Sequence, residues 1–395
     1  MSKWLNLGAL FLSMVSGYSA CLAWPPLSPL IKEDLSLGSL EVAAYSTMFF
    51  ITYTVLGPVA GAISDRVGAK TTILAGVLMG SAGAFLFGST HSYLLQLAAY
   101  LIIGAACTFI FTPGPKIINA WADPGETGLF SGVWSSGIFT ASMLTTFVGP
   151  LIASVFGMNW RAVFHTFGAL GLVFSLVFYA VVRERPPKPR LTDGGGGASK
   201  VYTNPWIWII SLVFCSAVSS FWVNANYIPL YANTILPLVE AGRVSSAYGL
   251  VGLPAAILSG WLSDRLGWRT PFMIAGTLCL TCSVWIVFFG QTGNYMWIVF
   301  IFALVGWGPL FTTVPELALY IRAPGLPPEK IGTAMGLQSF LSYGTSLSMV
   351  TLSGWLLGHG YSFFHVFLIP SMLGVQGAVF SLFSIRAERM VKDKA

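Results

Sequence analysis

Residues 61–68 have the sequence GAISDRVG, and residues 260–267 repeat it as GWLSDRLG. Both octapeptides are short polar breaks between long apolar runs. Two further pairs recur at nearly the same spacing: Pro115-Lys116 with Pro315-Glu316, and Phe164-His165 with Phe364-His365. Matches that keep one spacing over such a length predict that the chain consists of two related halves.

The composition places these halves in a membrane. The chain has 395 residues, of which 55% are hydrophobic and 9% charged, and its mean hydropathy is +0.76. A soluble domain carries roughly 25% charged residues, so this chain could not cover its own surface in water. At roughly 20 apolar residues per membrane span, the length allows about twelve spans and no sizeable soluble domain. We therefore expect an all-α integral membrane protein, and nearly all cytosolic enzyme classes are excluded.

Twelve apolar runs fall into two sets of six. The first set covers about 5–30, 42–63, 71–90, 93–117, 128–156 and 162–182, and the second covers about 206–231, 245–263, 270–290, 295–320, 331–357 and 362–385. The segment between the sets is rich in proline, glycine and basic residues, which predicts a polar linker. We therefore predict two pseudo-symmetric six-helix bundles, residues 1–182 and 205–395, joined by the linker 183–204.

The basic residues predict the orientation of the chain. Most Lys and Arg residues fall near the termini, in the linker and in the loops on that same side, whereas the other side carries Lys32, Arg161 and Arg243. Positive charge is retained in the cytoplasm, so we expect both termini and the linker to be cytoplasmic in a bacterial-type inner membrane. The net charge of +6 is explained by this topology, and no nucleic-acid partner is expected. Lys3 precedes a long apolar run without a cleavage site, which indicates a retained first span.

The repeated octapeptide contains the pattern G-x-x-x-D-R-x-G, whose fixed positions are Gly61, Asp65, Arg66, Gly68, Gly260, Asp264, Arg265 and Gly267. It falls in the predicted cytoplasmic turns between spans two and three and between spans eight and nine. Together with Asn159-Trp160-Arg161 before span six, the pattern resembles the major facilitator superfamily over the whole chain. The resemblance implies that the two turns act as a latch between the halves, which stabilises the outward-facing state. The alternative is that they only fix topology.

One matching segment and several departures from family patterns indicate which branch of the superfamily the chain resembles. Residues 113–121, PGPKIINAW, look most like the cyanate-transporter-like and organic-anion branches. Tyr100, four residues before Gly104, stands where many proton-coupled members carry an arginine. Gly149-Pro150 lacks the surrounding glycines of drug/proton antiporters. Spans two and eight have no arginine outside their cytoplasmic ends, whereas nitrate carriers of the superfamily use such arginines, and this disfavours nitrate.

Two charges remain inside the apolar spans, Lys116 in span four and Glu316 in span ten. They occupy equivalent repeat positions, and a charge in hydrocarbon costs several kcal/mol unless it faces a partner or a wet cavity. In the family fold, spans one, four, seven and ten line the central cavity, so both residues are candidates for substrate binding or gating. The alternative for Lys116 is that its side chain extends to the cytoplasmic surface. This is harder for the shorter carboxylate of Glu316.

Prolines are expected to break the cavity-lining helices. Pro25 and Pro26 are expected to end span one, Pro113 and Pro115 to interrupt span four, and Pro309 and Pro315 to interrupt span ten. A proline releases backbone groups that can bind a polar substrate where the helix lines a cavity. The alternative for each is an ordinary kink.

Uncharged polar side chains supply the other candidates for substrate binding: Tyr18, Asn224, Asn226, Tyr227, Gln338 and Tyr343. Amide and phenol groups can donate hydrogen bonds to a carboxylate without burying a charge. The alternative for each is a structural bond between helices. His165 and His365 lie near the outer ends of supporting spans and are interpreted as structural.

These residues favour a secondary active or facilitative transporter, a symporter or uniporter of a small organic or inorganic anion. One alternative is a proton-coupled carrier of a neutral or cationic amphiphile, with Glu316 as the acidic anchor. Another is a membrane receptor or scaffold that does not transport. No metal, cofactor or catalytic constellation is evident in the sequence, so we expect a monomer whose partners are the small solute, protons where transport is coupled, and the lipid bilayer.

Overall fold

The computed structural model describes residues 3–122, 127–183, 199–326 and 331–392, and the described ranges contain helices and no strands. The first half of the chain forms α1 (Lys3–Leu22), α2 (Trp24–Leu35), α3 (Ser39–Val67), α4 (Ala69–Ser89), α5 (Tyr93–Phe111), α6 (Gly114–Trp121), α7 (Thr127–Val155) and α8 (Trp160–Val181). The second half forms α9 (Ser199–Tyr202), α10 (Pro205–Ile235), α11 (Leu238–Leu250), α12 (Gly252–Leu266), α13 (Thr270–Thr281), the 3₁₀ turn η1 (Cys282–Val284), α14 (Trp285–Gln291), α15 (Tyr295–Tyr320), α16 (Ile331–Gly358) and α17 (Phe363–Lys392). Most of the predicted linker lies outside the described residues.

Eleven described segments are long and apolar enough to cross a membrane. The twelfth predicted span corresponds to α16, which is long enough but is not among the eleven. Its sequence is rich in serine and threonine, which lowers its hydropathy. Several of these hydroxyls donate to carbonyls one turn earlier in the same helix, as Thr345 does to Leu341 and Ser353 to Met349. Such local bonds satisfy hydroxyl groups away from water.

The helix breaks follow the prolines only in part. The fourth span is interrupted between α5 and α6 at Thr112-Pro113, as predicted. The expectation for span ten is wrong, because α15 continues through both of its prolines. Each proline removes one helical hydrogen bond, and packing of α15 on α13 keeps the helix intact. Pro25 and Pro26 begin the new helix α2 instead of ending the span, in agreement with the preference of proline for the first helical turn.

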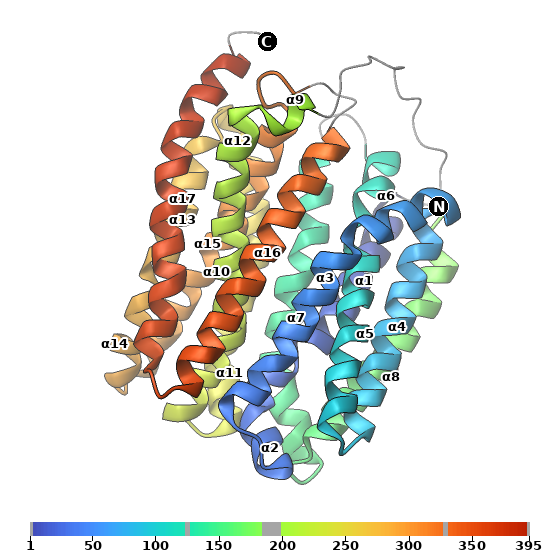
Figure 1. Ribbon diagram of the computed structural model, residues 1–395, viewed down its shortest axis with the longest axis vertical. Coiled ribbons are helices and arrows are strands. Elements are labelled where there is room, and N and C mark those ends of the chain that lie inside the picture. Colours follow the sequence, from blue (N-terminus) through green and yellow to red (C-terminus); the bar gives the residue numbers. More distant parts are fainter. Residues whose placement is uncertain (1–2, 123–126, 184–198, 327–330, 393–395) are drawn as a thin grey trace.

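The two halves of the chain lie side by side (Figure 1), with α1 to α8 on the right and α10 to α17 on the left. They meet where α3 packs on α16 and where α7 packs on α11 and α12. Helix α1 begins and α17 ends on the same side of the molecule, at the top of Figure 1. We call this side the terminal face and the other side the opposite face. Helix α9 lies at the terminal face, where Val201 is buried against the ends of α15 and α16.

The predicted orientation gives a direct labelling pattern. In a cysteine-free background, single cysteines at Ser92 and Asn294, which lie in exposed turns between helices, are expected to react with a membrane-impermeant thiol reagent added to intact cells. Cysteines at Gly195 and Lys394, both outside the described residues, are expected to be protected because basic segments stay in the cytoplasm. Labelling is followed by gel shift. The reverse pattern would overturn the orientation.

Candidate functional site

Three tyrosines form a chain of hydroxyl groups between the halves. The Tyr18 and Tyr53 hydroxyls of α1 and α3 are 2.9 Å apart, and the Tyr53 hydroxyl donates to that of Tyr343 on α16 at 3.1 Å. All three side chains are buried. Tyr18 and Tyr343 were predicted as site residues, and the structure brings them together through Tyr53. Sequence reasoning missed Tyr53, because it falls in the aromatic run FFITY, which suggests only core packing.

A second polar junction lies toward the opposite face. Ser46 of α3 donates to Asn226 Oδ1 of α10 at 2.7 Å, and the Trp24 indole donates to the Ser46 hydroxyl at 3.2 Å. The side-chain NH₂ group of Asn226 donates to the Trp222 carbonyl at 2.7 Å. The structure therefore places Asn226 at the boundary between the halves, as expected of a residue beside a central site.

Two other predicted residues bond within the second half. Asn224 donates to Ser283 at 3.1 Å, at the 3₁₀ turn that interrupts span nine, and Tyr227 donates to the Val350 carbonyl at 2.8 Å. The amide groups of Asn224 and Asn226 lie two residues apart and so point to different sides of α10. In this conformation, Asn224 and Tyr227 therefore fit the alternative interpretation, bonds between helices.

Glu316 is fully buried and lies beside another predicted residue, Gln338 of α16. The Gln338 amide donates to Glu316 Oε1 at 2.7 Å. Glu316 Oε2 and Gln338 Oε1 have no hydrogen-bond partner among the described residues. Each of these two oxygen atoms lacks a hydrogen-bond donor. A proton on the carboxyl group, a donor group of a ligand or a water molecule would supply one.

Lys116 lies apart from Glu316. It is exposed on α6, and its Nζ donates to Ser64 Oγ at 3.1 Å, inside the first octapeptide repeat. This places the cation beside the turn that joins α3 to α4, on the terminal side of the tyrosine chain. Phe111, at the end of α5, connects the two regions, because its ring centroid lies 6.4 Å from that of Tyr53 and 6.2 Å from that of Tyr343.

Aromatic side chains surround the tyrosine chain. The Trp222 ring of α10 lies 6.1 Å from Tyr18, 5.2 Å from Phe49 and 5.0 Å from Phe50, measured between centroids. It therefore packs a residue of the second half against α1 and α3 of the first. The tyrosine hydroxyls are thus enclosed by packed aromatic side chains in this conformation, and a few polar groups set in apolar surroundings are typical of small-molecule sites.

The two repeated turns end their helices at glycines with positive φ, 93° at Gly68 and 66° at Gly267. Only glycine adopts such conformations readily, so the last glycine of each repeat has a backbone role. Asp264 lies 3.7 Å from Arg269, and the Arg265 guanidinium lies 5.2 Å from the Trp261 ring. These contacts fall within the second half. The side chain of Asp65 lies outside the described part of the chain, and the latch role stays a prediction.

A carboxylate from α17 caps the helix that follows the second turn. Glu388 Oε1 accepts from the Arg269 N–H at 2.6 Å, and Oε2 accepts from the Thr270 N–H at 3.0 Å and the Thr270 hydroxyl at 2.6 Å. These bonds satisfy N–H groups at the start of α13 that have no helical partner. Burial lowers the pKa of Arg269, as does repulsion by Arg322, whereas Asp264 and Glu388 oppose this shift. No sequence pattern pointed to Glu388, because it is remote from the turn along the chain.

Replacing Glu388 with alanine is expected to destabilise the second half. The change leaves two backbone N–H groups and one hydroxyl without an acceptor in a buried place, which costs about 2 kcal/mol or more. Thermal unfolding in detergent should show a lower Tm for Glu388→Ala and a smaller decrease for Glu388→Gln, which keeps one acceptor. A wild-type Tm for the alanine variant would show that the cap is not needed.

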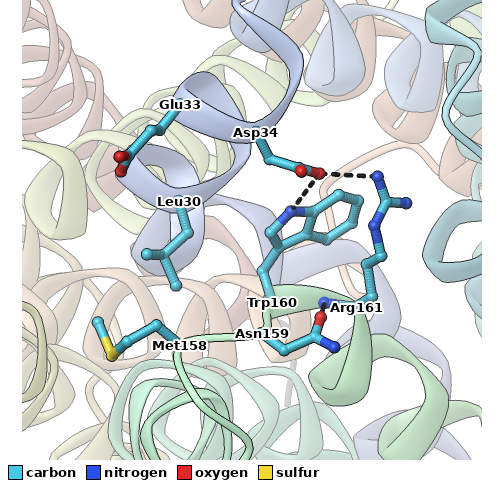
Figure 2. A pocket seen from close by; sticks show the side chains of 7 residues that line it. All are labelled: Leu30, Glu33, Asp34, Met158, Asn159, Trp160 and Arg161. Atoms are coloured by element: carbon cyan, nitrogen blue, oxygen red, sulfur yellow. Dashed lines mark hydrogen bonds and ion pairs between the residues drawn. The ribbon is translucent and has the colours of Figure 1, made fainter.

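A polar clamp lies at the opposite face. Arg161 donates to Asp34 Oδ2 at 2.7 Å and contacts His91 Nδ1 at 3.0 Å, and the Trp160 indole donates to the same Asp34 oxygen at 3.2 Å. Figure 2 shows Asp34 facing both partners at one side of a cavity of about 490 Å³. The cavity is lined by Leu30, Glu33, Asp34, Met158, Asn159, Trp160 and Arg161. The clamp ties α2 to α8, because Asp34 lies on the former and Arg161 on the latter.

The halves are packed together near the opposite face. The Thr47 and Thr351 hydroxyls are 3.0 Å apart across the junction of α3 and α16. A Cβ atom on Gly354 would lie 2.6 Å from Ala43 Cβ, and one on Gly242 would lie 2.3 Å from the Thr146 carbonyl oxygen. These distances leave no room for a side chain, so α3 approaches α16 closely at Gly354, and α7 approaches α11 closely at Gly242. The structure therefore represents a conformation closed on this side.

Known proteins resemble the chain along most of its length. The family model of the Major Facilitator Superfamily matches residues 9–348. A Mycobacterium tuberculosis protein named "Probable nitrate/nitrite transporter NarK2" is 27% identical over 65% of this chain, which covers 66% of that relative's length, just under two thirds. "Membrane sensor protein UhpC" of Salmonella typhimurium is 27% identical over 84% of this chain and 80% of the relative. "Probable L-galactonate transporter" of Escherichia coli is 22% identical over 90% and 83%.

The match to the family model, the membrane-spanning helices and the repeated turns agree with one another. Members of this family are transporters that bind small molecules within the membrane. The chain belongs to the Major Facilitator Superfamily and is an integral membrane protein.

Proposed function

We propose that the protein carries a small organic or inorganic anion across a bacterial inner membrane by alternating access. In this proposal, α16 is the twelfth span, and residues 1–182 and 205–395 form two six-helix bundles that rock about the tyrosine chain. The terminal face is cytoplasmic, and the linker 183–204 joins the bundles there. The protein works as a monomer. An anion agrees with the organic-anion and cyanate-transporter-like branches of the superfamily, which residues 113–121 resemble.

The tyrosine chain is the observation that carries the proposal. Its bonds run from α1 through α3 to α16, so it joins the two halves at the place where a solute would pass between them. The Tyr53 hydroxyl has one proton and donates it to Tyr343, so it accepts a hydrogen bond from Tyr18. The hydroxyl proton of Tyr343 therefore has no acceptor among the three tyrosines. A phenol proton at the end of a hydrogen-bond chain is a good donor to an anion.

Lys116 supplies positive charge on the terminal side of this site. It follows Phe111 on the same span, and Phe111 lies against both Tyr53 and Tyr343. A cation at the entrance and hydroxyl donors further inside favour a solute with acceptor atoms and negative charge. The names of the nitrate/nitrite and galactonate relatives agree with an anion. Spans two and eight carry arginine only near their ends, as Arg66, Arg243 and Arg265, which disfavours nitrate for this chain.

The test uses purified protein. We expect one class of anion, screened with nitrate, cyanate and L-galactonate, to raise the Tm, and the same anion to enter proteoliposomes. Tyr343→Phe should bind it more weakly, with a somewhat lower Tm in the absence of the anion because the buried Tyr53 hydroxyl loses its acceptor. Galactitol is the matched uncharged control for L-galactonate. Stabilisation by galactitol or an organic amine, with none by any anion, would contradict the proposal.

Glu316 favours the second candidate, a proton-coupled carrier of a neutral or cationic amphiphile. Its unpartnered Oε2 and the unpartnered Gln338 Oε1 would both be satisfied by a proton on the carboxyl group. A carboxyl group that is neutral when buried and ionised when exposed to water is suited to carry a proton. In this case, Glu316→Gln should abolish uphill transport driven by a proton gradient and retain exchange without one. Equal loss of both activities would argue against proton coupling at Glu316.

A membrane receptor is the third candidate, because one relative is named a membrane sensor protein. The same proteoliposome assay separates it from a carrier. Ligand stabilisation without uptake, exchange or efflux would favour the receptor.

A further inference from the structure

Trp134 of α7 lies against the break between α5 and α6. Its ring stacks on Phe111 with a centroid distance of 5.0 Å and an interplanar angle of 29°. A Cβ atom on Gly114, the first residue of α6, would lie 2.3 Å from Trp134 Cζ2 and 3.1 Å from its Nε1. The indole therefore occupies space that exists only because residue 114 is glycine. Trp134 is 4% exposed.

The indole N–H of Trp134 has no acceptor among the described residues. An indole nitrogen only donates, so no change of protonation can satisfy it. A buried donor without an acceptor is unfavourable, and an alternating-access protein has a second conformation in which the donor can be paired. The break beside it allows such a change, because Pro113 and Pro115 lack the N–H groups that would continue the helix.

Phe111 also contacts Tyr343, whose hydroxyl proton has no acceptor among the three tyrosines. Phe111 contacts both Trp134 of the first half, stacked at a centroid distance of 5.0 Å, and Tyr343 of the second, nearly perpendicular at 6.2 Å. Both neighbours offer a donor, an indole N–H and a phenol O–H. Two donors that belong to neighbours of one apolar ring complement a ligand with several acceptor oxygens, such as a carboxylate or another oxyanion.

We propose that Trp134 is a substrate-binding residue, whose N–H donates to an oxygen of the transported anion when α6 moves away from α7 at the proline break. This inference rests on the anion carrier proposed above and adds a donor from α7, a helix outside the four that line the cavity in the family fold. It predicts that the transported anion offers acceptor oxygens to both donors, the Trp134 N–H and the Tyr343 O–H.

The test replaces Trp134 with 3-benzothienylalanine, which has the shape of tryptophan but no N–H group. Calorimetric titration with L-galactonate, nitrate and cyanate identifies the anion that the wild-type protein binds. We expect affinity for that anion to fall about tenfold or more, as for loss of a hydrogen bond to a charged group. The Tm without anion should stay the same or rise, because an unsatisfied buried donor has been removed. Trp134→Phe is the second variant, with the same expected loss of affinity.

The matched control places the same analogue at Trp160, whose N–H already donates to Asp34 at 3.2 Å outside the site. This control should lower the Tm and leave anion affinity unchanged. Unchanged affinity in both Trp134 variants would overturn the inference while the anion carrier stands. If the wild-type protein binds none of the anions, the proposed function itself fails and the inference fails with it.

Discussion

Valine in place of Gly242 is expected to abolish transport and to hold the protein open at the opposite face. A Cβ atom at this position would lie 2.3 Å from the Thr146 carbonyl oxygen of α7, a distance that requires the two helices to separate. A penalty of about 3 kcal/mol on the closed conformation shifts the equilibrium by more than a hundredfold. Since every cycle passes through that conformation, anion uptake into proteoliposomes should fall to background.

The open state has its own readout. A cysteine at Ser46, which is buried and donates to Asn226 Oδ1 of the other half at 2.7 Å, should become reactive to an impermeant thiol reagent in the Gly242→Val background. The control is Gly344→Val on α16, because a Cβ atom there meets nothing within 4 Å. It should keep transport and leave Ser46→Cys protected. Wild-type uptake in Gly242→Val would show that closure at this face is not part of the cycle.

Lys116 and Glu316 are expected to be the most sensitive charged positions. They occupy equivalent repeat positions but have different partners here, Ser64 and Gln338, so the structure holds them apart in this conformation. We predict that they approach each other when the terminal side closes, which would favour that state by about 1–3 kcal/mol. Lys116→Ala and Glu316→Ala should each reduce the uptake rate tenfold or more. The exchange Lys116→Glu with Glu316→Lys should restore part of it.

Other outcomes separate the alternatives. Lys116→Arg is the conservative control, since it keeps the charge. If Lys116 only binds the anion, Lys116→Ala loses affinity, Glu316→Ala has little effect and the exchange restores nothing. If both alanine variants transport normally, the charges are outside the mechanism. Asn226 and Tyr343 then remain the better site residues, because they already connect the two halves.

Residue type alone predicted many residues of the candidate site. It did not predict which residues would be their hydrogen-bond partners. Tyr18, Asn226, Gln338 and Tyr343 were identified because polar groups in apolar spans need partners. The partners themselves, such as Tyr53 and Ser46, gave no signal, since one tyrosine in an aromatic run or one serine in a membrane helix is common. Asn224 was grouped with Asn226, although neighbouring positions on a helix face different directions.

The sequence by itself determined the class of the protein, its helical spans and its duplicated turns. Hydrophobicity over about 20 residues and a nearly constant spacing between repeats are properties of the linear chain, and no folding is needed to evaluate them. Only the tertiary structure decided the continuity of α15 through two prolines and the cap of α13 by Glu388. The same holds for the N–H of Trp134, which has no acceptor among the described residues. Each depends on which helix lies beside which, and contacts between residues far apart in the chain leave no local pattern.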